Sequence, residues 1–82
     1  HLTYLNRNET EEYINHRLEV VGRTDPIFVK ESFDLIYEYS NGLPRKINNV
    51  CDLSLMIGFC QEAKMIDNQI LDGVIGNLTR RV

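Results

Sequence analysis

The stretch "SNGLPRKINNVCD", residues 40–52, decides the fold because it ends one helix and begins another. Gly42 can adopt the left-handed conformation that ends helices, and Pro44 is favoured in the first helical turn. Arg45 and Lys46 then lie in that turn, where the positive end of the helix dipole disfavours a cation by about 0.3–1 kcal/mol. The free N–H groups at a helix start also attract anions. The position of Arg45 is therefore explained if an anion binds at this helix start.

Two helices are predicted before this stretch. The first begins after Asn8, which can cap it together with Glu11 in a variant of the capping box, and it ends at Gly22. A turn at Asp25-Pro26 follows, because a residue before proline is disfavoured in a helix. The second helix runs from about Lys30 to Ser40. The side chains expected to face the core are Ile14, Leu18, Val21, Ile27, Phe28, Phe33, Ile36 and Tyr37.

The third helix is predicted from Pro44 to about Glu62 and is the most apolar, as is typical of a central helix. Ser54 and Gly58 on it would allow a neighbouring helix to approach closely. Asp67 can cap a fourth helix, whose inward side chains are Ile70, Leu71, Val74, Ile75 and Leu78. No strand hairpin is visible. The sequence therefore predicts an all-α fold, a small four-helix bundle over residues 1–82.

Composition and charge exclude several classes of protein. The 82 residues carry 12 acidic and 9 basic side chains, a net charge of −3, whereas a dedicated nucleic-acid-binding module usually has a concentrated basic surface. No apolar run reaches the roughly 20 residues that span a bilayer, and no signal peptide is visible. We expect neither direct nucleic-acid nor membrane contact. The opening "HLTYL" resembles mid-chain sequence, so we expect a piece of a longer protein.

The two cysteines, Cys51 and Cys60, are not expected to form a disulfide. On one helix they would lie about 13.5 Å apart along the axis, beyond the roughly 7 Å limit for Cα atoms of a disulfide. No histidine lies near either in the sequence, so a metal site is not predicted. We expect both to be buried small hydrophobic residues in a reducing compartment.

No set of residues predicts catalysis by this chain alone. There is no phosphate-binding G-x-x-x-x-G-K-[ST] loop. His16, near Glu12 and Glu19, is assigned a structural or solvent-facing role. The acidic cluster Glu9, Glu11 and Glu12 is assigned to the helix start. His1 is placed at a frayed end. The four tyrosines, Tyr4, Tyr13, Tyr37 and Tyr39, are placed at the edge of the core.

Arg45 has two explanations when the residues are considered alone. One is an anion site, for which the planar guanidinium suits the bidentate binding of phosphate oxygens. The other is an ion pair with Asp34, Glu38 or Asp52, or simple solvation. Lys46, one position further round the helix, points about 100° away and is expected to be solvated.

Two segments resemble the lid of certain AAA+ ATPases. The segment "GLPRKINNVCDLSL" resembles the Gly-x-Pro-Arg-x-Ile-Asn element that opens the sensor-2 helix, and "ETEEYINHRLEVVG" resembles the first lid helix. The resemblance is closest to ExeA-like (general secretion pathway protein A-type) ATPases, which have relatives in pilus biogenesis and transposition. It covers about residues 1–62, and the last twenty residues match loosely. Val29 stands where such proteins often have a capping Thr or Ser.

The resemblance implies a lid that closes over ATP. The Walker motifs, which bind the phosphates and Mg, would belong to a preceding α/β core domain of the same protein. Arg45 would be the sensor-2 arginine that contacts the terminal phosphates and so acts in catalysis. Gly42, Leu43 and Pro44 would hold its backbone, with Leu43 beside the adenine. The resemblance also implies a homo-oligomeric cytoplasmic ATPase, at the inner face of the membrane if a secretion or membrane partner recruits it.

The alternative is a helix-turn-helix module, made of the second and third helices, that contacts DNA or another protein. A recognition helix needs polar side chains that read bases. The predicted third helix instead carries "VCDLSLMIGFC", and only Arg45, Lys46, Asn48 and Asn49 could reach a groove. The sequence therefore favours the lid.

Overall fold

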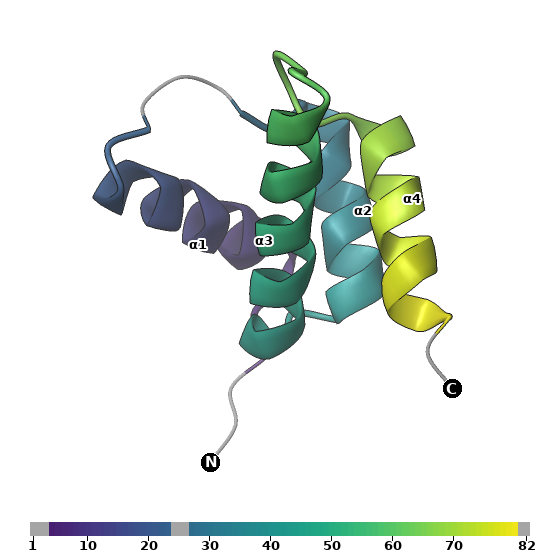
Figure 1. Ribbon diagram of the computed structural model, residues 1–82. Coiled ribbons are helices and arrows are strands. Elements are labelled where there is room, and N and C mark those ends of the chain that lie inside the picture. Colours follow the sequence, from purple (N-terminus) through teal and green to yellow (C-terminus); the bar gives the residue numbers. More distant parts are fainter. Residues whose placement is uncertain (1–3, 24–26, 81–82) are drawn as a thin grey trace.

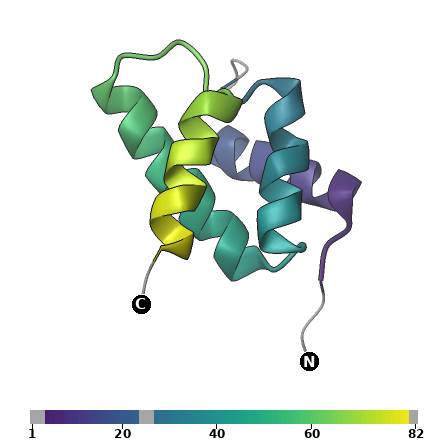
Figure 2. The same ribbon diagram turned by 90° about the vertical axis from the view of Figure 1, so that its right-hand side faces the viewer.

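The computed structural model describes residues 4–23 and 27–80, and over these ranges the protein is all-α, as predicted. The helices are α1 (Arg7–Val20), α2 (Lys30–Ser40), α3 (Pro44–Cys60) and α4 (Asn68–Thr79) (Figure 1). Figures 1 and 2 show α2, α3 and α4 as a small bundle, with α1 lying across it. Both α2 and α3 pack against all three other helices. The predicted central place of α3 is thus confirmed.

The start of α1 differs from the prediction. The N-cap is Asn6 and not Asn8, and the reciprocal residue is Glu9 and not Glu11. The Asn6 side chain accepts a hydrogen bond of 2.8 Å from the N–H of Glu9, and the Glu9 carboxylate accepts one of 2.9 Å from the N–H of Asn6. Asn8 and Glu11 both lie within the helix instead. Glu11 pairs there with Arg7.

The end of α1 follows the prediction for Gly22. This residue has a φ of +84°, and the next N–H, of Arg23, donates to the carbonyl of Leu18 at 2.8 Å. These are the bonds of a Schellman cap. Val21, predicted to face the core, is 70% exposed, because the helix has ended before it. The predicted turn at Asp25-Pro26 lies outside the described residues.

The start of α2 is held by the chain that precedes α4. The N–H of Val29 donates to the carbonyl of Ile66 at 3.0 Å, and the N–H of Ile66 donates to the carbonyl of Ile27 at 2.7 Å. Val29 makes no side-chain cap, and the hydroxyl of Ser32 donates back to its carbonyl. Tertiary hydrogen bonds therefore position this helix start without the Thr or Ser cap.

The core is formed by buried apolar side chains from all four helices and the connections: Ile14, Leu18, Ile27, Phe28, Phe33, Ile36, Ile47, Val50, Cys51, Ile66, Leu71 and Val74. Asp67 caps α4 as predicted, accepting from the N–H of Ile70 at 3.1 Å. Tyr37, predicted to face inward, is only half-buried and is not among the side chains that pack against this core. Gly58 is buried against Ile66, which belongs to the connection before α4 and not to a neighbouring helix.

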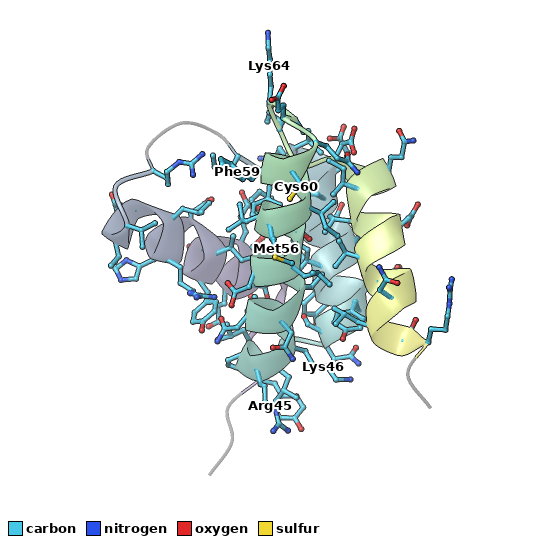
Figure 3. All side chains as sticks on the ribbon, viewed as in Figure 1. Arg45, Lys46, Met56, Phe59, Cys60 and Lys64 are labelled. Carbon is cyan, nitrogen blue, oxygen red and sulfur yellow. The ribbon has the colours of Figure 1, made fainter. Side chains whose placement is uncertain are left out.

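One face of α3 is apolar and exposed, which the sequence did not predict. Met56 is 57% exposed, Phe59 is 84% exposed and Cys60 is also exposed (Figure 3). The prediction of two buried thiols is therefore right for Cys51 and wrong for Cys60. The helix ends at Cys60, two residues before the predicted Glu62, because Glu62 adopts a left-handed φ of +56°. None of the helices described is long and apolar enough to cross a bilayer.

Candidate functional site

The turn between α2 and α3 brings Arg45 to the molecular surface through two successive left-handed residues. Asn41 has a φ of +52° and Gly42 a φ of +79°. The N–H of Gly42 donates to the hydroxyl oxygen of Ser40 at 3.2 Å, and the N–H of Leu43 donates to the Ser40 carbonyl at 3.0 Å. Leu43 is the N-cap of α3, and Pro44 occupies the first turn. The turn is therefore formed by backbone and buried polar contacts, with Gly42 where the sequence predicted it.

The start of α3 has no cap. Leu43 cannot accept a hydrogen bond with its side chain, and the first turn contains no acidic residue. Among the described residues, no acceptor is found for the N–H groups of Arg45 and Lys46. The starts of α1 and α4 are capped by Asn6 and Asp67, and the start of α2, which also lacks a side-chain cap, carries the acidic Glu31 in its first turn. Free N–H donors and the positive end of the helix dipole thus lie together at the start of α3. This is the arrangement that attracts an anion.

The side chain of Arg45 is exposed and extends away from the helices at the lower end of α3 in Figure 3. The ion-pair alternatives are not found within residues 4–23 and 27–80. Asp34 pairs with Arg7 at 2.5 Å, and Asp52 lies 3.6 Å from Arg17. Two of the three acidic partners considered for Arg45 are therefore engaged by arginines of α1.

Lys46 leaves the same turn in a different direction (Figure 3). Its Nζ lies 5.6 Å from the centre of the Tyr39 ring on α2, a distance typical of a cation–π contact. The expectation of simple solvation is thus incomplete, although Lys46 is exposed. The contact directs this cation along α2, so the two adjacent basic residues are not equivalent.

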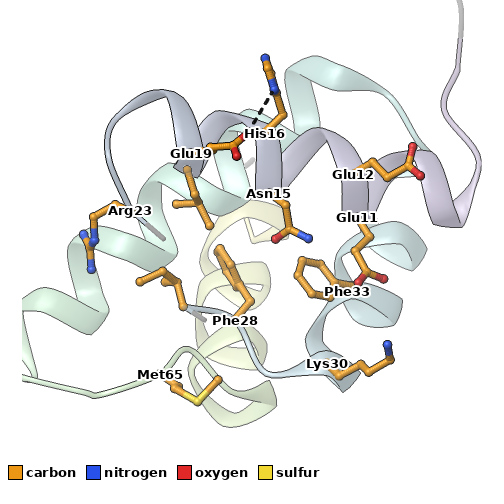
Figure 4. Close-up of a pocket in the computed structure, with 12 residues that line it drawn as sticks. Glu11, Glu12, Asn15, His16, Glu19, Arg23, Phe28, Lys30, Phe33 and Met65 are labelled. Carbon is orange, nitrogen blue, oxygen red and sulfur yellow. Dashed lines mark ion pairs between the residues drawn. The ribbon is translucent and has the colours of Figure 1, made fainter. Parts of the chain in front are cut away.

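A surface pocket of about 700 Å³ lies elsewhere, between α1 and the start of α2 (Figure 4). Phe28 and Phe33 form its floor. His16 and Glu19 lie 4.0 Å apart on its α1 side, and both are largely exposed. The predicted solvent-facing position of His16 is confirmed, because 74% of its side chain is exposed.

The predicted site residues Gly42, Leu43, Pro44 and Arg45 line neither this pocket nor two smaller ones, of about 380 and 580 Å³. They lie at the start of α3, outside these three pockets. No group of three or more metal-binding side chains occurs in the part of the chain that the structure describes. His1 lies outside that part. The arrangement can bind an anion presented by another surface, and it provides no enclosed site of its own.

The exposed face of α3 is unsuited to reading bases. From its middle to its end it carries Asp52, Met56 and Phe59 outward, while Val50 and Ser54 are buried. Asn48, one of the polar residues considered for a groove, accepts hydrogen bonds from α1 instead. The helix-turn-helix alternative is therefore not favoured.

The start of α3 also contacts a residue that sequence reasoning missed. The N–H of Leu5, in the segment before α1, donates to the carbonyl of Gly42 at 2.9 Å. Leu5 belongs to none of the sequence motifs described above, and Leu5 and Gly42 are far apart in sequence. No pattern in the sequence could have paired them.

A sequence comparison finds a similar segment in a much longer protein. Over 66 residues the chain is 33% identical to General secretion pathway protein A of Aeromonas hydrophila. The match covers 80% of this chain and 12% of that protein, so the chain spans about an eighth of the relative's length. No family model and no solved structure matches the chain.

Proposed function

We propose that this chain is the nucleotide-sensing lid domain of an AAA+ ATPase related to General secretion pathway protein A. In this proposal an α/β core domain of the same protein binds ATP and Mg. The lid closes over that site and Arg45 contacts the terminal phosphates. The 33% identity to the A. hydrophila protein supports a secretion-related parent protein. The parent would be a cytoplasmic homo-oligomer, with a secretion partner at the inner face of the membrane.

The observation that carries the proposal is the uncapped start of α3. Its free N–H groups, its dipole and the exposed guanidinium of Arg45 all favour an anion arriving from outside the domain. No ion pair of Arg45 is found among the described residues, so simple solvation is the alternative that remains beside an anion site. The donors fit phosphate oxygens, which guanidinium binds in a bidentate manner.

The residues of the turn have separate roles in this proposal. Gly42 and Pro44 set the backbone from which Arg45 extends. Leu43, half-buried at the N-cap, supplies an apolar side chain next to the adenine. The 82-residue chain contains no phosphate-binding loop, so it is expected to hydrolyse no ATP by itself.

The test is Arg45→Ala in the full-length parent protein, with Lys46→Ala as the matched control. A charge-assisted hydrogen bond contributes about 1.5–3 kcal/mol, so the loss of Arg45 should lower ATP turnover at least about tenfold. Lys46→Ala should change turnover by less than about threefold, because that side chain is directed to Tyr39.

The stability of the apo protein separates a functional from a structural arginine. Arg45 is exposed and its ion pair is not found, so Arg45→Ala should change the free energy of unfolding by less than about 1 kcal/mol. Normal turnover in Arg45→Ala would refute the sensor role. A loss of turnover that accompanies a lowered apo melting temperature would make Arg45 a structural residue.

A further inference from the structure

The segment before α1 lies directly on the turn that carries the candidate site. Besides the 2.9 Å hydrogen bond from Leu5 to Gly42, the backbones are so close that a side chain cannot fit between them. A Cβ at residue 42 would lie 1.8 Å from the carbonyl oxygen of Leu5 and 2.8 Å from its carbonyl carbon. Gly42 is thus required for two reasons, its φ of +79° and this close approach. We call this arrangement the Leu5–Gly42 contact.

Each side of the contact is held in place. On one side, Asn6 follows Leu5 and caps α1, and its carbonyl accepts hydrogen bonds of 2.8 Å from both the N–H and the hydroxyl of Thr10. Thr10 is fully buried. These bonds tie the residue after Leu5 to the first turn of α1, so Leu5 and the start of α1 are expected to move together.

On the other side, the contact acts on the start of α3. The N–H of Gly42 is bonded to the fully buried Ser40, so both backbone polar groups of Gly42 are used. The carbonyl of the next residue, Leu43, accepts a hydrogen bond of 3.0 Å from the N–H of Ile47, and this bond lies at the start of α3. Arg45 lies three residues after Gly42. A displacement of residue 42 therefore moves the first turn of α3 and the side chain of Arg45 with it.

We propose that Gly42 is a positioning residue for Arg45, through which the segment before α1 sets the place of the guanidinium. The inference rests on the function proposed above for Arg45. It adds that a movement of the entry segment reaches the phosphate-facing turn through the direct Leu5–Gly42 contact. Gly42 then needs no contact with the nucleotide itself.

The test compares Gly42→Ala with Gly22→Ala in the full-length parent protein. Both glycines have a left-handed φ, +79° and +84°, but a Cβ at Gly22 would have no atom within 4 Å. The two variants thus share the conformational strain and differ in the close approach. Gly42→Ala should lower turnover at least about tenfold while changing nucleotide affinity less than about threefold, and Gly22→Ala should change neither by more than about twofold.

A second pair of variants serves if Gly42→Ala does not fold. Leu5→Pro removes the N–H that donates to Gly42 and places a ring carbon there. Leu5→Ala shortens the side chain and keeps the N–H, so it is the matched control. Leu5→Pro should reproduce the loss of turnover at retained nucleotide affinity, and Leu5→Ala should not. Normal turnover in a folded Gly42→Ala or Leu5→Pro protein overturns the inference.

A double-mutant cycle distinguishes positioning from a general structural effect. If the contact acts through Arg45, then turnover of the Gly42→Ala/Arg45→Ala protein should equal that of Arg45→Ala within about twofold. Independent effects, which multiply, would overturn the inference and leave the function of Arg45 intact. Normal turnover in Arg45→Ala alone would instead refute the proposed function, and the inference with it.

Discussion

The hydroxyl of Tyr13 donates a hydrogen bond of 2.9 Å to Oδ1 of Asn48, which joins α1 to the first half of α3. Arg17, one turn further along α1, donates to the same oxygen and lies 3.6 Å from Asp52. Within the described ranges α1 packs against α2 and α3 but not α4. This group of polar side chains is therefore a principal connection between α1 and α3.

Replacing Asn48 by alanine should destabilise the domain, because two donors on α1 lose their acceptor. Asn49→Ala is the control, since Asn49 is exposed on the same helix and gains the same helix propensity. Asn48→Ala should be less stable than Asn49→Ala by about 1–2 kcal/mol. Urea unfolding of the 82-residue chain measures the difference. Equal stabilities would show that the hydrogen bonds contribute nothing.

Two glycines on helices should respond to alanine in opposite directions. A Cβ at Gly58 would lie 2.3 Å from Cδ1 of the buried Ile66, whereas a Cβ at Gly73 would meet nothing within 4 Å. Gly73→Ala should stabilise the chain by about 0.5–1 kcal/mol through helix propensity. Gly58→Ala should destabilise it by about 1–3 kcal/mol through overpacking. Thermal melts decide this, and a stabilised Gly58→Ala would contradict the packing at Ile66.

The two thiols should differ sharply in reactivity. Cys60 is exposed, and Cys51 is buried. Burial raises the pKa of Cys51 to about 12, so almost none of it is the reactive thiolate at neutral pH. Labelling of the native chain at about pH 7.5 should modify one thiol quickly and the second only in denaturant. Loss of the rapid phase in Cys60→Ser would identify it, and rapid labelling of both thiols would refute the burial of Cys51.

The raised pKa of Cys51 also predicts a pH dependence of stability. Below the ordinary pKa of 9.0 the thiol is protonated in both the folded and the unfolded chain, so its contribution to stability does not change with pH. Between there and about 12 the unfolded chain loses the proton while the folded chain keeps it. Stability should therefore fall as the pH rises, by up to about 1.4 kcal/mol per unit from this group. Urea midpoints measured from neutral to alkaline pH should fall more steeply for the wild type than for Cys51→Ala. Parallel curves would show that Cys51 contributes nothing to the pH dependence of stability.

Local sequence was enough to predict most of the fold. The bounds of α2, the end of α1 at Gly22 and the cap at Asp67 agree with the prediction. The end of α1 and the cap of α4 depend on bonds within a few residues, whereas the start of α2 is also held by tertiary hydrogen bonds with Ile66. The prediction of Asn8 as the cap of α1 was wrong, because the cap is Asn6. Both can cap a helix, and the Leu5–Gly42 contact places Leu5 and Asn6 before the helix.

Burial at the ends of helices was less predictable, since periodicity shows which residues share a face but not how far a neighbour covers it. Val21 and Cys60 continue apolar stripes and are exposed, because the packing of α1 and α3 stops before them. The exposure of Phe59 has the same origin. These positions needed the relative placement of the helices.

By itself, the sequence determined that Arg45 lies in the first turn of a helix, because Gly42 and Pro44 act on the chain within one turn. Only the tertiary structure decided what surrounds it. Contacts with α1 engage Asp34 and Asp52 elsewhere, and Leu5 lies against Gly42. Such pairings join residues tens of positions apart and depend on helix packing, for which no local pattern exists.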